Sequence, residues 1–476
     1  MVMFGNISIR QLLFAGTFVS LYFYSFYIIF FERRRNLDFL KNGYKKNFLY
    51  PNVCLLDISF LILIISIIFF SLVVPVFTHS SLVLAKAEVF SSLLMLTLCF
   101  PLFYLIKIGE INLTRLNKCI YFLVFILSLI HVVLYTGQEI TGYFIYNYFF
   151  FLNTVLGKTS IFPVIMLGHM GVPRVFFTTS IFLPLGIYFS LKNLKNFKLF
   201  DHIYLTVNIL AITSTMTKSL WLGTVLGILT YLIFNIVRLK KENRKNEIKK
   251  IIVLIIEMCT IALVANFSVF NNRVFHHFNN SFVYEKGDKE KYSSELSEEF
   301  KNKIKEKFKN NVDAYHDREG SIISNNIKIK QSQLLLRKWL KRPLLGYGYG
   351  SYLENFIRSE EAPFSYEMLF FSLLMKTGIV GVLCWIFLIL SLIYIKYKYG
   401  KGNISDFSSW LFLSVSFGIL VQTNPLLFNS VGIAFLLFIS MSAINSFALC
   451  RVSSENTLKS RNKNIRNYNV INGSVE

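Results

Sequence analysis

The residues best suited to chemistry gather between Lys328 and Gly381. Six cations with no acid among them precede a glycine-rich turn, Gly346-Tyr-Gly-Tyr-Gly, and a single carboxylate, Glu367, follows it. Lysine and arginine bind phosphate oxygens, and a carboxylate can accept the proton of a hydroxyl group. This stretch therefore predicts a site that holds a phosphorylated substrate beside a general base.

Each of these features also has a plainer interpretation. The basic stretch would suit a helix lying on anionic lipid headgroups. The glycine turn is not a dinucleotide fingerprint, because it neither follows a strand nor opens a βαβ unit. Tyr347 and Tyr349 fit stacking on sugar rings or a place at the membrane interface. Glu367 fits a helix N-terminus, where a carboxylate complements the helix dipole.

The composition of the chain indicates a membrane protein rather than a soluble one. Of 476 residues, 54% are hydrophobic and only 16% are charged, so we expect an all-α, polytopic membrane protein. The formal charge of +23 comes mostly from lysines and arginines between apolar runs, where the positive-inside rule places them. Nucleic acid is therefore not needed as a partner.

Apolar segments of roughly 17 to 25 residues predict about 11 transmembrane helices, with a range of about 10 to 12. Every second connection between them is basic, which places those connections in the cytoplasm and the N-terminus outside. The six cysteines lie inside or at the ends of these runs without a CxxC pair, which indicates buried small hydrophobes rather than metal ligands or disulfides. The expected spans are 9–31, 53–77, 81–106, 119–136, 173–191, 202–217, 219–237, 251–270, 378–395, 407–422 and 430–449.

The outward connections contain most of the unusual residues. They include 138–172, interpreted as interfacial or partly re-entrant, and a large periplasmic loop that carries amphipathic helices. Arg174 and Lys218 lie at outward ends of spans. A charged residue there can have a functional role, or it can be a snorkelling residue at the membrane interface. The chain thus divides into transmembrane helices in 1–270, the periplasmic loop in 271–377, transmembrane helices in 378–449 and a basic cytoplasmic tail in 450–476.

The segment after Glu367 is predicted to be broken. One continuous span from Tyr366 to Ile395 would place Lys376 in hydrocarbon, which costs several kcal/mol. We therefore expect a short surface helix over 365–376, a break at Gly378 and a span that starts at Ile379. Glu367 then lies outside the membrane, in the first turn of the surface helix.

With these residues identified, the part of the chain from about Val172 to Ile444 resembles the bacterial O-antigen polymerase and O-antigen ligase superfamily of polytopic inner-membrane glycosyltransferases. Four pieces carry the resemblance through their order and spacing. They are Val172-Pro-Arg-Val, Thr215-Met-Thr-Lys-Ser-Leu-Trp-Leu-Gly, Arg337-Lys-Trp-Leu-Lys-Arg-Pro-Leu-Leu-Gly-Tyr-Gly-Tyr-Gly-Ser-Tyr and Thr423-Asn-Pro-Leu-Leu-Phe.

The sequence departs from the ligase pattern at two positions. Lys218 stands where arginine is usual, and Tyr366-Glu367 stand where ligases carry a His-Asn pair. The second exchange keeps a proton acceptor, and it favours a polymerase over a ligase.

The resemblance implies a substrate and a reaction. The substrate is an undecaprenyl-pyrophosphate-linked oligosaccharide, whose anomeric carbon is attacked by an acceptor sugar hydroxyl as pyrophosphate leaves, without a metal or a nucleotide cofactor. The residues assigned to it are Glu367 as the base; Arg174, Lys218, Arg337, Lys328 and Lys330 on the pyrophosphate; and Tyr347, Tyr349, Tyr366 and Asn424 on the glycan.

The same resemblance implies partners and a location. We expect membrane lipid, a flippase and a chain-length regulator as partners, and an active site that faces the periplasm from the inner membrane. Two alternatives remain: a ligase that transfers finished glycan to lipid A core or another acceptor, and a lipid-linked oligosaccharide flippase without chemistry. Against the flippase, the two halves of the chain show no convincing internal repeat.

Overall fold

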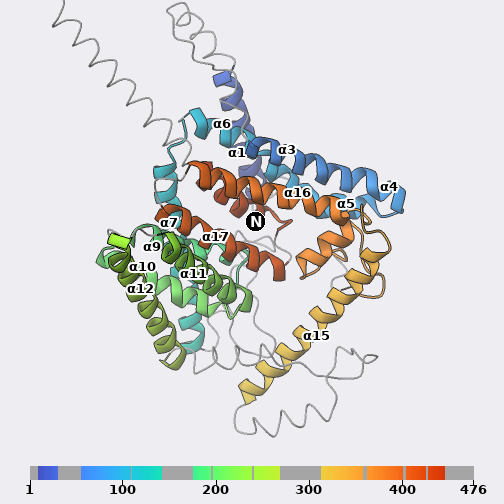
Figure 1. Cartoon of the computed structure of the whole chain (residues 1–476). Coiled ribbons are helices and arrows are strands. Elements are labelled where there is room, and N and C mark those ends of the chain that lie inside the picture. Colours follow the sequence, from blue (N-terminus) through green and yellow to red (C-terminus); the bar gives the residue numbers. More distant parts are fainter. Residues whose placement is uncertain are drawn as a thin grey trace, which may run out of the picture.

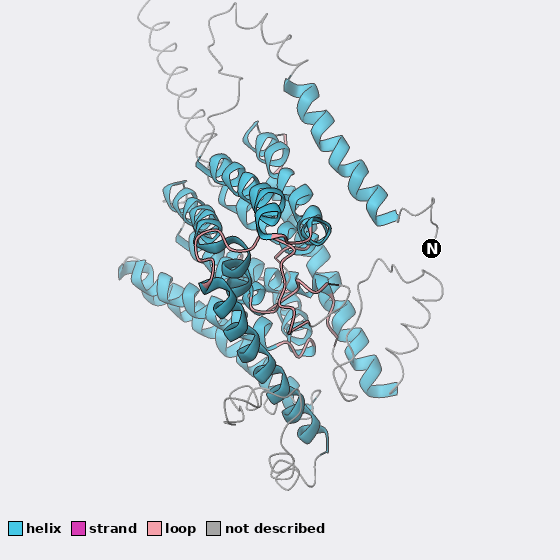
Figure 2. Ribbon diagram, turned by 90° about the vertical axis from the view of Figure 1, so that its right-hand side faces the viewer, coloured by secondary structure: helices cyan, strands magenta, loops and turns pink. Residues whose placement is uncertain are grey.

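The described part of the protein is built entirely from helices and loops. The computed structural model describes residues 9–29, 55–108, 110–141, 175–194, 197–238, 241–268, 312–357, 362–399, 404–424 and 427–444. Within these ranges the regular structure is helical (Figure 2). The predicted all-α class is confirmed.

Helix occurs at each of the eleven positions where a span was expected. Among the described residues, five helical stretches are long and apolar enough by themselves to cross a membrane: Leu55–Thr78, Leu82–Lys107, Leu113–Gly137, Lys218–Val237 and Leu369–Lys398. The elements before the predicted periplasmic loop are α1 (Ile9–Tyr27), α3 (Leu55–Ile68), η2 (Phe69–Val73), α4 (Val74–Thr78), α5 (Leu82–Thr97), α6 (Cys99–Ile108), α7 (Leu113–Thr141), η4 (Thr178–Phe182), α9 (Pro184–Lys192), α10 (Leu199–Ser214), α11 (Lys218–Arg238) and α12 (Lys241–Ser268). After it come α15 (Val312–Leu340), α16 (Leu369–Tyr399), α17 (Ile404–Thr423) and a last helix, Ser430–Ile444.

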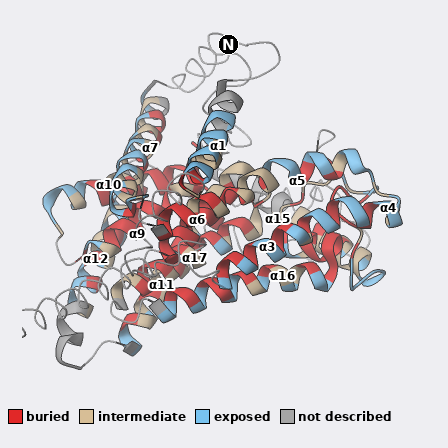
Figure 3. Cartoon of the chain, turned by 90° about the horizontal axis from the view of Figure 1, so that it is seen from above, coloured by how far each residue is buried: buried red, intermediate tan, exposed pale blue. Residues whose placement is uncertain are grey.

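Two packed groups of helices make up the body of the molecule. In one, α16 runs along α3, and in the other α11 runs along α17, while α15 leads away from the body as a long arm (Figure 1). Residues between the helices are buried, whereas exposed residues lie on the outer sides of the helices (Figure 3). The exposed residues include large apolar ones such as Phe77, Val83 and Val225. Such apolar outer surfaces suit a lipid environment and confirm a polytopic membrane protein.

Helix α16 is broken at Gly378, as the sequence predicts. Gly378 has φ 61° and ψ −165°, so the backbone leaves the helical path there. The break frees backbone groups, which bond to the turn after α15 instead. The exchanged bonds are Ile379 N to Pro343 O (2.9 Å), Val380 N to Leu344 O (3.2 Å), Tyr347 N to Met375 O (3.0 Å) and Gly348 N to Lys376 O (2.7 Å).

A second irregular turn lies opposite this loop. The second predicted span changes from the α-helix α3 to the π-helical turn η2 and returns to α-helix at Val74, with Pro75 at the start of α4. The carbonyl of Phe70, within η2, accepts the N–H of Tyr349 at 2.9 Å. The glycine-rich turn is thus bonded to two different helices through its backbone.

Ion pairs join neighbouring helices of the body. Lys107 in the last turn of α6 pairs with Asp57 of α3, and both side chains are buried. Asp406 of α17 bridges Lys192 of α9 (3.4 Å) and Lys396 of α16. These lysines had been expected near cytoplasmic ends of spans, and their partners come from other helices.

Three sequence predictions lie outside the described residues. They are the re-entrant segment beyond Thr141, the amphipathic helix that carries Leu296, Phe300, Ile304 and Phe308, and the basic tail in 450–476. Within the predicted periplasmic loop, α15 supplies a described helix.

The break in α16 generates a stability prediction. A Cβ atom at residue 378 would lie 2.2 Å from Leu344 O, and φ is positive, so Gly378→Ala should lower the stability by about 2 kcal/mol or more. Thermal unfolding of the purified protein measures this loss. The matched control is Gly418→Ala in α17, where nothing lies within 4 Å and alanine gains helix propensity of up to ~1 kcal/mol. Equal melting temperatures for the two variants would contradict the proposed strain.

Candidate functional site

The second half of α15 presents one buried face to α16. Gln331 and Leu335 are fully buried, and they lie four residues apart on the same side of the helix. Lys328 lies three residues before Gln331 and so faces the same way. This face, rather than the whole basic stretch, adjoins the segment that carries Glu367.

Lys328 and Glu367 meet at the start of α16. The ammonium Nζ of Lys328 lies 3.4 Å from Oε2 of Glu367, and both side chains are partly exposed, 32% and 23%. With its amide oxygen turned toward the backbone, Gln331 accepts hydrogen bonds from Glu367 N (2.9 Å) and Met368 N (3.2 Å). A buried side chain of α15 therefore fixes the backbone beneath this cation and carboxylate, whose facing oxygen, Oε2 of Glu367, is itself buried.

Glu367 lies just before the helix rather than in its first turn. Helix α16 begins at Leu369, and the 365–368 stretch is not helical, so the surface helix expected from Ser365 starts four residues later. The physical reason is that Gln331 accepts the N–H groups of Glu367 and Met368, and the segment turns toward α15 to reach it.

Tyr366 acts as a structural anchor for this segment. It is only 2% exposed, and its hydroxyl oxygen accepts the N–H of Leu353 at 2.6 Å. Burial raises the pKa of Tyr366 to about 12, so the phenol stays neutral at physiological pH. The ring lies 5.7 Å from the ammonium of Lys376, within cation–π range.

The other cations predicted from α15 lie elsewhere. Arg337 is nine residues after Lys328, which places it about 180° away on an α-helix, and its side chain is exposed. Lys330 lies 6.0 Å from the ring of Phe356. Lys328 is thus the predicted cation of α15 that the structure brings to Glu367.

Two basic residues that the sequence assignment did not include contact the glycine turn. Lys338 and Arg342 lie 5.0 Å and 5.2 Å from the centre of the Tyr347 ring. Lys338 also donates to Tyr352 O at 2.6 Å, and burial lowers its pKa while the charge of Glu354 opposes that shift. Lys338 lies seven residues after Gln331 within α15, and this helical spacing is the signal that could have indicated this face.

The two predicted glycan tyrosines of the turn differ in exposure. Tyr347 is half-buried, and its carbonyl accepts from Thr78 Oγ1 (2.7 Å) and Ser80 Oγ (3.1 Å). Tyr349 is fully buried, with its ring 5.2 Å from that of Phe428. Its position is that of a core residue, away from any surface where a sugar could stack.

Lys218 and Asn424 lie on neighbouring helix ends. Asn424, just after α17, donates to Ser219 Oγ at 2.8 Å, and Lys218 precedes Ser219 as the first residue of α11. Gln422 of α17 accepts the N–H of Phe370 at 3.2 Å. This bond links the end of α17 to the start of α16, three residues from Glu367.

Arg174 lies outside the described residues. The next residue, Val175, donates its N–H to Ser214 O at 3.2 Å, at the end of α10. The chain at 175 therefore runs close to the turn that precedes Lys218.

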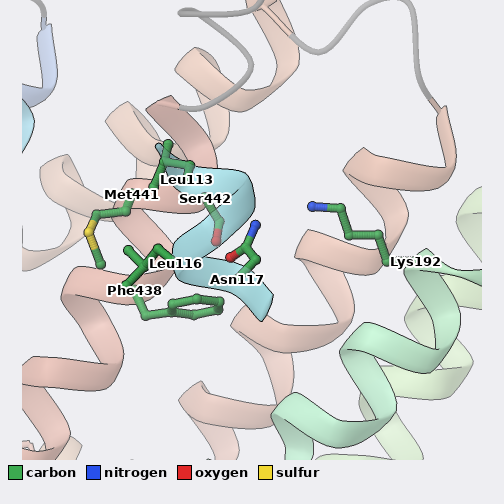
Figure 4. Close-up of a pocket in the computed structure, with 7 residues that line it drawn as sticks. All are labelled: Leu113, Leu116, Asn117, Lys192, Phe438, Met441 and Ser442. Atoms are coloured by element: carbon green, nitrogen blue, oxygen red, sulfur yellow. The ribbon is translucent and has the colours of Figure 1, made fainter. Parts of the chain in front are cut away.

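A recess elsewhere in the molecule does not belong to this site. It lies between α7, Lys192 and the last helix, with the amino group of Lys192 directed toward Asn117 and Ser442 (Figure 4). Lys192 pairs with Asp406 in the first turn of α17, whereas Asn424 follows the last turn, so the recess is at the opposite end of that helix. It has essentially no room for a water molecule, which leaves its polar groups a structural role.

Comparison with known proteins identifies one matching region. Residues 203–386 match the Wzy_C family, described as O-antigen ligase. Among curated proteins and among solved structures, nothing matches the chain. The matching region runs from α10 into α16 and includes Lys218, Lys328 and Glu367; Glu88 and Asn424 lie outside it.

The Tyr366 anchor can be tested by removing one oxygen atom. Tyr366→Phe leaves the buried N–H of Leu353 without its acceptor, which should cost about 1–3 kcal/mol. Thermal unfolding should show a lower melting temperature. Tyr352→Phe, in a partly exposed ring of the same loop, is the matched control, and an equal effect in both variants would contradict the anchoring role.

Proposed function

Because residues 203–386 carry a domain of the O-antigen polymerase and ligase superfamily, we propose that this multi-pass membrane protein is a glycosyltransferase that polymerises lipid-linked oligosaccharides. Its substrates are two undecaprenyl-pyrophosphate-linked repeat units of O-antigen or capsule. The reaction takes place at the outer face of the inner membrane, where the positive-inside pattern places Glu367.

The observation that carries this proposal is the pair formed by Lys328 and Glu367. Transfer from a pyrophosphate-linked donor needs a cation for the leaving group and a base for the acceptor hydroxyl. The ammonium and the carboxylate lie 3.4 Å apart, their side chains are partly exposed, and the backbone that carries Glu367 is held by Gln331.

The proposed reaction balances through one bond made and one bond broken. The acceptor hydroxyl oxygen attacks the anomeric carbon of the donor, and the bond from that carbon to the pyrophosphate oxygen breaks. Glu367 takes the hydroxyl proton, and undecaprenyl pyrophosphate leaves with the bonding electrons. Lys328 would move from Glu367 to the leaving phosphate, which frees the carboxylate to act as the base.

The other cations proposed as pyrophosphate ligands are supported by different observations. Lys218 lies on the helix end bonded to Asn424 and, through Gln422, is connected with the start of α16. Arg174 keeps its proposed role through its place in the sequence beside Val175. Arg337 projects from the opposite side of α15, so we propose Lys328 ahead of it.

Polymerase is preferred to ligase because a glutamate stands where ligases carry a His-Asn pair. The two activities share the donor and differ in the acceptor. In a deletion strain, loss of the glycan ladder with single repeats still attached to surface lipid supports the polymerase. Loss of all attachment supports the ligase.

A flippase of lipid-linked oligosaccharide is the alternative without chemistry. Purified protein in lipid vesicles, given lipid-pyrophosphate repeat units, should lengthen them if it is a polymerase. Transfer of unextended substrate across the bilayer, with no product longer than one repeat, would support the flippase.

Glu367→Gln should abolish chain extension while the protein still inserts and purifies normally. The amide keeps the size of the side chain but cannot accept the proton, and loss of a general base costs about 10²–10⁴-fold in rate. Gel analysis of product length measures the effect. Glu354→Gln, an exposed glutamate in the same loop, should retain activity, and near-normal extension by Glu367→Gln would refute the catalytic role.

Chain extension should not depend on a divalent metal. The proposed leaving group is stabilised by side-chain cations, so dialysis against a chelator should leave the initial rate within about twofold. Restoration of a lost rate by added Mg²⁺ or Mn²⁺ would contradict this mechanism.

A further inference from the structure

We propose that Glu88 of α5 is a positioning residue that holds both the glycine turn and the segment carrying Glu367. The inference rests on the proposed function for its kinetic consequence, while its geometric part stands without it. Glu88 belongs to the third predicted span, 81–106, far in sequence from the residues that resemble the superfamily.

Glu88 and Lys376 form a buried ion pair between α5 and α16. Their side chains are 4% and 2% exposed. Oε1 of Glu88 bonds to the ammonium of Lys376, and Oε2 accepts the backbone N–H of Gly350 at 2.7 Å. The two oxygens therefore bind different parts of the site framework, which only a carboxylate can do with acceptors alone.

The glycine turn is seated directly on α5 at this point. Gly350 has φ +78°, and a Cβ atom there would lie 2.3 Å from Ala85 N. The carboxylate of Glu88 is one helical turn from Ala85, under the same part of the loop. Because this turn follows α15 after five residues, the position of Lys328 depends on where the turn is held.

Lys376 extends the contact to the segment before α16. Its ammonium donates to Phe364 O at 2.8 Å and lies 5.9 Å and 5.7 Å from the rings of Phe364 and Tyr366. Glu367 follows directly. Lys376 thus fixes this segment from the protein interior, and Gln331 fixes it from α15.

The geometric part can be tested by hydrogen–deuterium exchange of the purified full-length protein. In Glu88→Gln the amide cannot offer both acceptors, so exchange should accelerate by at least about tenfold in 346–353 and in 364–368. The matched control is Asp57→Asn, which breaks the buried pair with Lys107 at the far ends of the same two helical stretches, away from this loop. The inference is overturned if both variants accelerate exchange equally in the loop, or if neither does.

A double variant separates positioning from the cost of a buried unpaired charge. Glu88→Gln with Lys376→Met removes both charges, which often restores the stability lost by removing one partner. The melting temperature should recover toward the parent value, whereas exchange in 346–353 should stay fast. Recovery of both would mean that the pair only balances charge, and the positioning role would be wrong.

The kinetic consequence is a fall in kcat at nearly constant KM for the lipid-linked donor. A displacement of about 1 Å at a reacting group costs about 100-fold in rate, so Glu88→Gln and the double variant should both lose kcat by that order. If the parent protein shows no transferase activity, the proposed function fails while the exchange result still decides the geometry. Normal kcat in a variant whose loop exchanges quickly would overturn the link between Glu88 and Glu367.

Discussion

The arrangement of the site depends on the need to pair backbone groups inside a membrane protein. A helix that breaks in an apolar surrounding leaves N–H and C=O groups that no water can satisfy. At Gly378 the turn after α15 supplies the missing partners, and its own backbone groups are satisfied in return. This reciprocal bonding fixes the end of α15 against α16. It therefore also fixes the distance between a cation on one helix and a carboxylate at the start of the other.

Charge inside the helical body follows the same rule. Glu88 with Lys376, Asp57 with Lys107, and Asp406 with its two lysines are each arranged so that a buried charge meets an opposite one on another helix. Burial of such pairs adds little net stability, yet loss of one partner is costly. The pairs thus act mainly to select one relative placement of the helices. At Glu88 that placement includes the glycine turn, because the carboxylate bonds to the backbone of Gly350 as well as to Lys376.

Much of the fold and part of the site could be predicted from local sequence. Apolar runs gave the helix positions, and the cost of Lys376 in hydrocarbon located the break at Gly378. The sequence alone could not predict which of Lys328, Lys330 and Arg337 lies beside Glu367. That depends on which side of α15 packs on α16, and α15 carries basic residues on several sides. Tyr349 was assigned to glycan binding, although it is buried in the core. An aromatic residue in a glycine-rich turn has the same sequence pattern whether it contacts a ligand or packs inside the protein. The pairing of Glu88 with Lys376 has no local signal, because the partners are 288 residues apart.

The π-helical turn η2 limits which parts of the protein can be exchanged with a relative. Its Phe70 carbonyl accepts Tyr349 N–H, and the carboxylate of Glu88 accepts Gly350 N–H, so the second and third predicted spans complete the backbone bonding of the loop. The region that matches the superfamily, 203–386, contains the donors but neither acceptor. The region 203–386 alone therefore lacks two of the hydrogen-bond acceptors that hold the loop. A chimera with a relative would have to carry the hairpin of α3 to α5 together with the matched region, and the two segments are expected to vary in concert during divergence.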